Sequence, residues 1–246
     1  MRYLLSRASR PVLTRLAGER TLCAFDFDGT LAPIVERPEQ AGMRARTRRL
    51  LARLAAAYPC IIVSGRARAD VLGKLGGVEV AQVIGNHGAE PGGTQAKARR
   101  QIERWKEALE VEIGTFPGVW VEDKGFSLAV HYRQCHRKAA ARRRILEVSR
   151  KLEQASVFGG KKVINLAVQG APRKGDALAS ERDRLRCRWV LFVGDAEDDE
   201  DAFALKGNTI AVRVGRKRQS HASYFLRSQA EIDKLLEVLV SRRQAV

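Results

Sequence analysis

The sequence predicts an α/β protein, a Rossmann-like doubly wound parallel sheet with an inserted α+β domain. Short, continuously apolar runs alternate with segments of helical periodicity, as expected for strands buried on both faces of a parallel sheet. Several of these runs end in polar groups, and open parallel sheets bind ligands at the carboxyl ends of their strands. The middle of the chain instead alternates apolar and polar residues, which indicates antiparallel strands.

The core begins with a strand–helix–strand unit. Leu50, Leu51 and Leu54 fall on one face of a helix predicted at 47–57, and a short helix is predicted at 69–75. Before them, Val12 and Leu16 repeat at helical spacing and mark the start of the fold. The apolar runs that predict the core strands are 21–25, 60–65, 78–84, 189–195 and 209–214.

The insert has a different pattern. Residues 119–133 read as two alternating strands joined by a polar turn, which predicts an antiparallel hairpin. Helices are predicted on either side at 97–113 and 142–156, followed by a strand at 162–168. We therefore expect a catalytic core formed by 1–90 and 171–246, with an α+β cap at 91–170.

Composition narrows the function only in part. The chain has 246 residues, 45% of them hydrophobic, and a net charge of +17, which suits nucleic acid, an anionic membrane surface or an anionic small substrate. The basic residues are dispersed and not interleaved with aromatic ones, so nucleic-acid binding is a remote alternative. No apolar stretch approaches the roughly 18 residues of a membrane span. We expect a cytoplasmic, monomeric protein whose partner is a small molecule, with no nucleic acid and no membrane. The scattered cysteines, expected to be reduced core thiols, are Cys23, Cys60, Cys135 and Cys187.

Asp26 and Asp28 follow the first strand and lie on the same side of the chain, while Gly29 allows a sharp turn after them. Two carboxylates at about 4 Å repel by about 4 kcal/mol at an effective dielectric of about 20, so a cation or a shared proton is needed. A divalent metal meets that need. The polar groups at the ends of the other predicted strands are Ser64, Asn86, His87, Asp195 and Asp199.

These groups suit the hydrolysis of a phosphate ester. Asp26 would attack phosphorus, and Asp28 would protonate the departing oxygen and later accept a proton from water. Mg²⁺ held by Asp26, the Asp28 carbonyl and Asp195 would offset the charge. Lys174 would add a positive charge, and Ser64 would hold phosphoryl oxygens.

Each candidate also has a structural explanation. Asp26 and Asp28 could only cap a turn, and Asp195 and Asp199 could only favour a helix N-terminus. Other residues with a plain capping, bracing or surface alternative are Ser64, Lys174, His87, His131 and Arg133.

Four ordered motifs resemble those of the haloacid-dehalogenase-like phosphatase superfamily, over about 20–205. They are Asp26-x-Asp28-Gly29-Thr30, Val63-Ser64-Gly65-Arg66, Lys174-Gly175, and Gly194-Asp195 with Asp199. The second aspartate points to the phosphatase and phosphomutase branch. A phosphomutase would share the aspartyl-phosphate step, and only analysis of its products would distinguish it.

Further segments are similar to the trehalose-6-phosphate phosphatase family over nearly the whole chain. They are Phe25 to Ile34, Gly85 to Glu90, Glu122-x-Lys124-Gly125, His131-Tyr132-Arg133 and Asp199 to Phe203. The resemblance implies a cap of the C2B type that closes over a disaccharide, and Mg²⁺ bound by Asp26, Asp28, Asp195 and Asp199. The implied substrate-binding residues are Thr30, Gly65, Arg66, Asn86, His87, Glu122, Lys124, His131, Arg133 and Asn165.

Two departures from the family pattern bear on specificity. Ala196 replaces the second carboxylate of Gly-Asp-Asp-x-Thr-Asp. Asn165 and Ala167-Val168 replace Glu and Arg-Pro in the segment before the motif lysine. The expected function is therefore Mg²⁺-dependent hydrolysis of a sugar phosphate, foremost trehalose 6-phosphate, with another glycosyl or disaccharide phosphate as the alternative.

Overall fold

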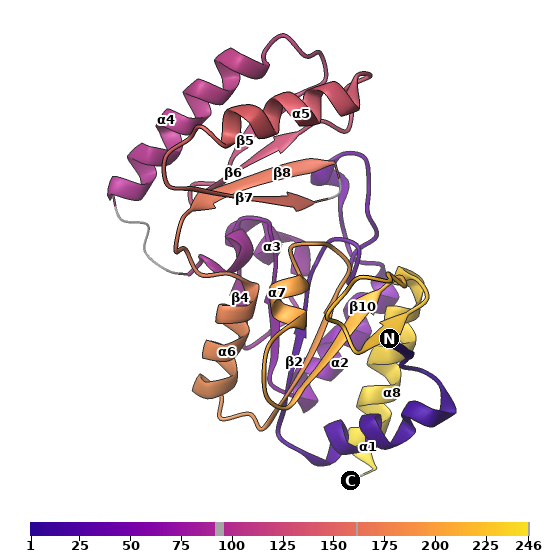
Figure 1. The fold of residues 1–246 in the computed structure, drawn as a ribbon. Coiled ribbons are helices and arrows are strands. Elements are labelled where there is room, and N and C mark those ends of the chain that lie inside the picture. The colour runs from indigo at the N-terminus through magenta and orange to yellow at the C-terminus, as the bar shows by residue number, and fades with distance from the viewer. Residues whose placement is uncertain (92–95, 161, 246) are drawn as a thin grey trace. The chain divides into compact units, whose positions relative to one another are not determined.

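The computed structural model describes residues 1–91, 96–160 and 162–245 (Figure 1). The chain forms two compact units. One consists of Met1–Gly88 and Arg173–Val246, and the other of Ala89–Pro172. These divisions fall two residues from the boundaries expected from sequence on either side of the insert.

A parallel sheet forms the centre of the first unit. Its strand order is β1-β11-β10-β9-β2-β3-β4 within the described residues. Strand order reverses between β2 and β9, because β3 and β4 extend the sheet on one side of β2, while β9, β10, β11 and β1 extend it on the other. The strands are β1 (Arg2–Tyr3), β2 (Thr21–Phe25), β3 (Cys60–Val63), β4 (Gln82–Ile84), β9 (Trp189–Gly194), β10 (Thr209–Val214) and β11 (Tyr224–Leu226).

Successive residues of each central strand enter different apolar clusters, as the alternation of a strand requires. Cys23 and Phe25 of β2 pack with α1 (Arg10–Gly18), α2 (Ala45–Ala57), α3 (Arg68–Leu75) and α8 (Ile232–Gln244). Leu22 and Ala24 pack with α6 (Lys174–Arg184) and α7 (Glu200–Phe203) on the opposite face. The sheet is therefore covered by helices on both sides. Short 3₁₀ helices lie at η1 (Arg7–Ser9), η2 (Pro38–Gln40), η3 (Asn86–Gly88) and η4 (Gln229–Glu231).

The second unit is an antiparallel sheet of order β5-β6-β8-β7 among its described residues. Leu128 and Val130 of β6, with Ile164 and Leu166 of β8, pack against both helices of the unit, so one face of the sheet is its core. Figure 1 shows these helices on the same side of the sheet. The elements are α4 (Ala96–Ile113), β5 (Trp120–Asp123), β6 (Ser127–His131), α5 (Lys138–Ser149), β7 (Ala155–Gly160) and β8 (Val163–Val168).

The predicted fold class is confirmed, with differences in single elements. The strand expected at 78–84 begins at Gln82, because Val78 packs into the core just after the left-handed Gly76 and Gly77. The helix expected at 142–156 is shifted to 138–149, and β7 begins at Ala155. Three strands, β1, β7 and β11, and the helix α8 were not expected from the sequence. In the part of the chain that is described, helices long and apolar enough to cross a bilayer are absent.

Candidate active site

Asp26 and Asp195 occupy equivalent places on neighbouring parallel strands. Asp26 directly follows β2, Asp195 directly follows β9, and these strands pair from Thr21↔Trp189 to Phe25↔Val193. The amide of Asp26 donates to the carbonyl of Val193 at 2.9 Å, which continues the ladder up to the first aspartate. Both carboxylates therefore emerge at the point where strand order reverses, the usual ligand site of an open α/β sheet.

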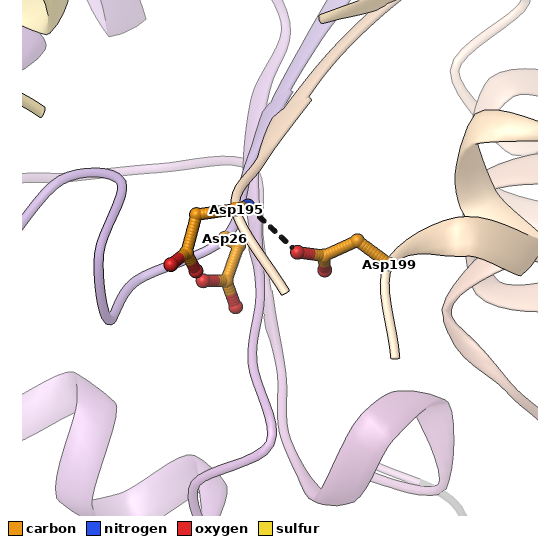
Figure 2. Close-up of side chains that lie close together, drawn as sticks. All are labelled: Asp26, Asp195 and Asp199. Carbon is orange, nitrogen blue, oxygen red and sulfur yellow. Dashed lines mark hydrogen bonds between the residues drawn. The ribbon is translucent and has the colours of Figure 1, made fainter. Parts of the chain in front are cut away.

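Asp199 joins these two residues in a cluster of buried carboxylates. One carboxylate oxygen from each of Asp26, Asp195 and Asp199 lies within 4.8 Å of the others. Figure 2 shows Asp26 and Asp195 side by side, with Asp199 approaching from the other side. Hard oxygen donors at this spacing fit Mg²⁺, which favours carboxylates and water. The donor set is thus suited to the expected metal.

Gly29 leaves room for the carboxylate of Asp195. Its φ is +82°, and a Cβ built at this position would lie 2.3 Å from Oδ2 of Asp195. Glycine is required here for both reasons, since other residues pay for a left-handed conformation and carry a Cβ. The turn after Asp28 and the position of Asp195 are thereby linked.

Asp199 also organises the loop that carries Asp195. Its Oδ2 accepts the backbone N–H groups of Asp195 and Ala196, each at 2.9 Å (the first is dashed in Figure 2). Its Oδ1 accepts from Nζ of Lys174 at 2.6 Å. Asp199 therefore combines a structural contact to the loop with a place in the acidic cluster.

Lys174 supplies the positive charge of the cluster. It is the first residue of α6 and is 1% exposed. Its Nζ lies 3.0 Å from Asp26, 3.0 Å from Asp198 and 2.6 Å from Asp199. Burial by itself would lower the pKa of Lys174, but the three carboxylates outweigh it and raise that pKa above its ordinary value.

The carboxylates respond differently to this environment. Burial is the main cause that raises the pKa of Asp26 well above its ordinary value; Lys174 opposes it, and Asp199 and Asp195 add to it. Burial likewise raises the pKa of Asp199 to about 6, against the opposing charge of Lys174. For Asp198 the balance is reversed, because Lys174 and His87 outweigh burial and hold its pKa below the usual range. Such spread among neighbouring carboxyls is typical of functional sites.

Asp28 is not one of the three clustered carboxylates, and its side chain pairs with Arg66. The guanidinium donates from Nε to Oδ2 at 2.6 Å and from a terminal nitrogen to Oδ1 at 2.9 Å. Arg66 also bonds Asp70 at 2.6 Å and the carbonyl of Pro38 at 2.9 Å. Arg66 thus makes a bidentate contact with Asp28, the predicted acid–base residue. This contact fixes the orientation of the Asp28 carboxylate.

The remaining predicted residues of this unit lie in the loops that follow β2, β3 and β4. Ser64 follows β3 and is 1% exposed, and its Oγ accepts from the amide of Arg66 at 3.2 Å. Asn86 and His87 follow β4 and are both buried. Thr30 is fully buried, and within the described part of the chain its hydroxyl has no hydrogen-bond partner. Gly65 lies against the His87 ring.

Asp198 and Arg213 are site residues that sequence reasoning missed. Asp198 contacts Lys174 and His87, and it lies two residues after Ala196, which replaces a family carboxylate in the same loop. Arg213 of β10 donates to the carbonyls of Asp195 at 2.6 Å and Ala196 at 2.9 Å. A charged residue within the otherwise apolar strand 209–214 could have indicated that Arg213 has a buried partner.

The predicted cap residues gather on the sheet face of the second unit that does not pack on α4 and α5. Nε2 of His131 lies 2.8 Å from Oε2 of Glu122, and Nζ of Lys124 lies 3.9 Å from the same oxygen. Trp120 stacks on His131 with ring centroids 4.0 Å apart. Asn165 is in register with Ala129, which pairs with Glu122, so the two polar residues lie in one row. Arg133 lies beyond the end of β6 and is half-buried.

Residues 24–230 match the model of the trehalose-phosphatase family. The chain belongs to the trehalose-phosphatase family. The matched segment contains Asp26, Lys174 and Asp195.

Individual relatives of the trehalose-phosphatase family agree with this assignment. The trehalose-phosphate phosphatase of Mycobacterium avium is 37% identical over 216 residues, which cover 79% of this chain and 54% of that protein. A probable trehalose-phosphate phosphatase 9 of Oryza sativa subsp. japonica is 29% identical and covers 91% of this chain and 71% of the relative. The chain thus spans about half the length of the mycobacterial relative.

Solved structures agree with the fold. The C-terminal domain of the C. albicans trehalose-6-phosphate phosphatase has a TM-score of 0.81 at 22% identity and covers 94% of this chain and 97% of that domain. A trehalose-6-phosphate phosphatase related protein has a TM-score of 0.71 at 26% identity, covering 89% and 97%. A haloacid-dehalogenase subclass IIB sugar phosphatase has a TM-score of 0.62 at 15% identity, covering 88% and 98%. The architecture of core and cap is therefore that of haloacid-dehalogenase-fold phosphatases.

Proposed function

We propose that the chain is a Mg²⁺-dependent phosphatase that hydrolyses trehalose 6-phosphate to trehalose and phosphate through an aspartyl-phosphate. The observation that carries this proposal is the cluster of Asp26, Asp195, Asp199 and Lys174 at the strand-order reversal of the sheet. Membership of the trehalose-phosphatase family supports the choice of substrate. The mycobacterial relative is about twice as long as the segment it shares with this chain, so its activity is proposed for this chain and not carried over from its name.

The proposed reaction has two displacements. A carboxylate oxygen of Asp26 attacks phosphorus and forms a new P–O bond, while the bond from phosphorus to the sugar oxygen breaks and that oxygen takes a proton from Asp28. Water then attacks the aspartyl-phosphate, gives a proton to Asp28, and releases phosphate with Asp26 regenerated. Asp28 thereby returns to its protonated state after each turnover.

Buried residues of this chain serve the charge balance of these steps. The side chains of Asp26, Asp195 and Asp199, with the carbonyl of Asp28, would hold Mg²⁺, which supplies positive charge that offsets the approach of a carboxylate to a phosphate dianion. Nζ of Lys174 lies 3.0 Å from Oδ1 of Asp26 and would hold that carboxylate in place. Ser64 would hold phosphoryl oxygens beside the nucleophile.

The nucleophile is tested by Asp26→Asn, which keeps the size of the side chain and removes its negative charge. We expect phosphate release from trehalose 6-phosphate to fall by at least about a thousandfold, because the residue forms the covalent intermediate. The matched control is Asp183→Asn, whose side chain is 70% exposed. Full phosphate release by Asp26→Asn would remove the basis of the proposal, as would turnover that is indifferent to chelation of Mg²⁺.

A second candidate is a phosphatase for a different glycosyl phosphate. The observation that favours it is Asn165, which is 3% exposed and stands where the family has a carboxylate. A site that hydrogen-bonds sugar hydroxyls discriminates strongly between substrates through such groups. Phosphate release across a panel of phosphorylated disaccharides separates the candidates. A preference for trehalose 6-phosphate supports the first, a preference for another disaccharide phosphate supports the second, and equal rates contradict both.

A further inference from the structure

The loop Asn86–Gly88 holds an unusual backbone conformation. Three consecutive residues have positive φ, +49° at Asn86, +60° at His87 and +119° at Gly88. Two of them carry side chains, for which a left-handed conformation is unfavourable. The amide of Asn86 donates to the carbonyl of Arg66 at 2.8 Å, and that of His87 to the carbonyl of Ser64 at 2.9 Å. These two hydrogen bonds to the loop that carries Ser64 therefore stabilise the unfavourable conformation.

This conformation places the imidazole of His87 directly on Gly65. A Cβ built at Gly65 would lie 2.4 Å from Cε1 and 2.8 Å from Nε2 of the ring. The next residue, Gly88, packs equally closely on Arg173. A Cβ built at Gly88 would lie 2.5 Å from the carbonyl oxygen of Arg173. One short loop thus contacts both the Ser64 loop and the residue that precedes Lys174.

Asp198 connects this loop to the acidic cluster. Its Oδ2 lies 2.9 Å from Nδ1 of His87 and 3.0 Å from Nζ of Lys174. The side chains of His87 and Asp198 are each 10% exposed. A carboxylate accepts only if Nδ1 carries the proton, so the pairing sets the tautomer and the ring orientation. A continuous path of contacts therefore runs from Gly65 through His87, Asp198 and Lys174 to Asp26.

We propose that His87 and Asp198 are positioning residues that align the Ser64 loop and the Lys174 ammonium with the nucleophile Asp26. The inference rests on the proposed phosphatase function and assigns His87 a role other than contact with the sugar. Neither residue takes part in bond making. Their effect is to keep the Ser64 loop and the Lys174 ammonium in register with Asp26, and a misplacement of about 1 Å costs about a hundredfold in rate.

Two single variants and their combination test this proposal. Asp198→Asn keeps the shape but loses the charge that holds Lys174, and His87→Asn keeps a side-chain N–H donor and a residue that tolerates positive φ but removes the ring. We expect kcat to fall about 10- to 100-fold with little change in KM. The activity loss in the double variant should not exceed that of the single variant with the larger loss, because both changes break the same path.

The inhibition constant of orthovanadate, which mimics the transition state of phosphoryl transfer, distinguishes positioning from a structural role. We expect it to rise in proportion to the loss in kcat/KM, while the melting temperature stays within a few degrees of the wild type. The matched controls, His136→Asn and Asp183→Asn at exposed sites, should leave kcat/KM and the inhibition constant of orthovanadate unchanged.

The positioning role is overturned if the variants keep the wild-type kcat and vanadate inhibition. It is also overturned if they only melt earlier while the folded fraction binds vanadate normally, or if the losses in the double variant simply add. A wild-type protein that releases no phosphate from any sugar phosphate contradicts the proposed function itself. An active wild type with unaffected variants contradicts the positioning role alone.

Discussion

Gly29 packs directly against the carboxylate of Asp195, because glycine has no Cβ. Gly29 has φ of +82°, and a methyl group there would overlap Oδ2 of Asp195 at 2.3 Å. Gly215 has nearly the same φ, +81°, but a Cβ there meets nothing within 4 Å. The two glycines thus share the backbone requirement and differ in their contact with the site.

Gly29→Ala should therefore damage the site beyond its effect on the backbone. We expect kcat/KM to fall at least about a hundredfold, because Asp195 must move away from its partners. Gly215→Ala, the control, should cost about 1 kcal/mol of stability and leave kcat/KM unchanged. Steady-state kinetics and urea unfolding of both variants check this. Equal losses of activity in the two variants would show that backbone strain, and not the contact with Asp195, is responsible.

Cys60 links burial at one residue to the pH dependence of stability. Burial raises the pKa of this thiol from 9.0 to about 12 in the folded chain. Because the folded pKa lies above the unfolded one, the stability this thiol contributes is fully present below about pH 9 and is lost between about pH 9 and 12.

We expect the free energy of unfolding to fall more steeply with pH in the wild type than in Cys60→Ala. At about pH 10.5 the difference from pH 8 should be larger by about 2 kcal/mol, at about 1.4 kcal/mol per pKa unit. Urea unfolding at the two pH values measures it. Parallel pH profiles would contradict the raised pKa.

At the scale of elements, β10 supports the loop between β9 and α7. Arg213 of β10 bonds the carbonyls of Asp195 and Ala196 and also Oε1 of Glu200, the last at 2.8 Å. The helix α7 has only four residues, Glu200–Phe203, so it offers little structure of its own. The planar fork of one arginine meets all three acceptors, which a lysine ammonium at the end of a flexible chain does not reproduce.

Arg213→Lys should therefore weaken metal binding at the acidic cluster. We expect the Mg²⁺ dissociation constant from calorimetry to rise about tenfold or more, as for other residues that orient metal ligands. The control is Arg188→Lys, whose side chain is 68% exposed and pairs with Glu19 at the surface. An unchanged Mg²⁺ affinity in Arg213→Lys would exclude this role for β10.

Elements also differ in how well the sequence predicts them. Every residue of β2 and β3 is buried, and these strands were predicted from their apolar runs. β7 was missed because Ala155–Gly160 lacks clear alternation, and it is a strand through its pairing with β8. β1 and β11 have two and three residues, which is too short for a period to show.

At the scale of the whole molecule, segments from distant parts of the chain build the site. Asp26, Ser64, Lys174 and Asp195 are separated by up to 169 positions, yet each lies at the end of a strand or the start of a helix in the same unit. The insertion of Ala89–Pro172 between them leaves that unit intact. Binding of a metal at this site should therefore stabilise the first unit as a whole.

We expect Mg²⁺ to raise the melting temperature of the first unit. At a hundred times its dissociation constant the ion adds about 2.7 kcal/mol, and each kcal/mol corresponds to about 2 to 4 °C for a chain of this size. Calorimetry with and without a chelator measures the shift. Asp195→Asn, which removes one carboxylate charge from the cluster, should lose most of it. A shift of the same size in this variant would place the binding elsewhere.

The sequence by itself determined the parallel core, the polar groups at its strand ends and the antiparallel insert. These features follow from local patterns, because strands buried on both faces must be apolar throughout and loops at their ends carry the polar residues. Only the tertiary structure decided that Asp198 bonds His87, that Arg66 orients Asp28 and that Arg213 holds the loop after β9. Such contacts depend on how whole elements pack. Arg66 and Asp28 are 38 positions apart in the sequence, and His87 and Asp198 are 111 positions apart. The helix and strand periods are local and carry no information over such separations.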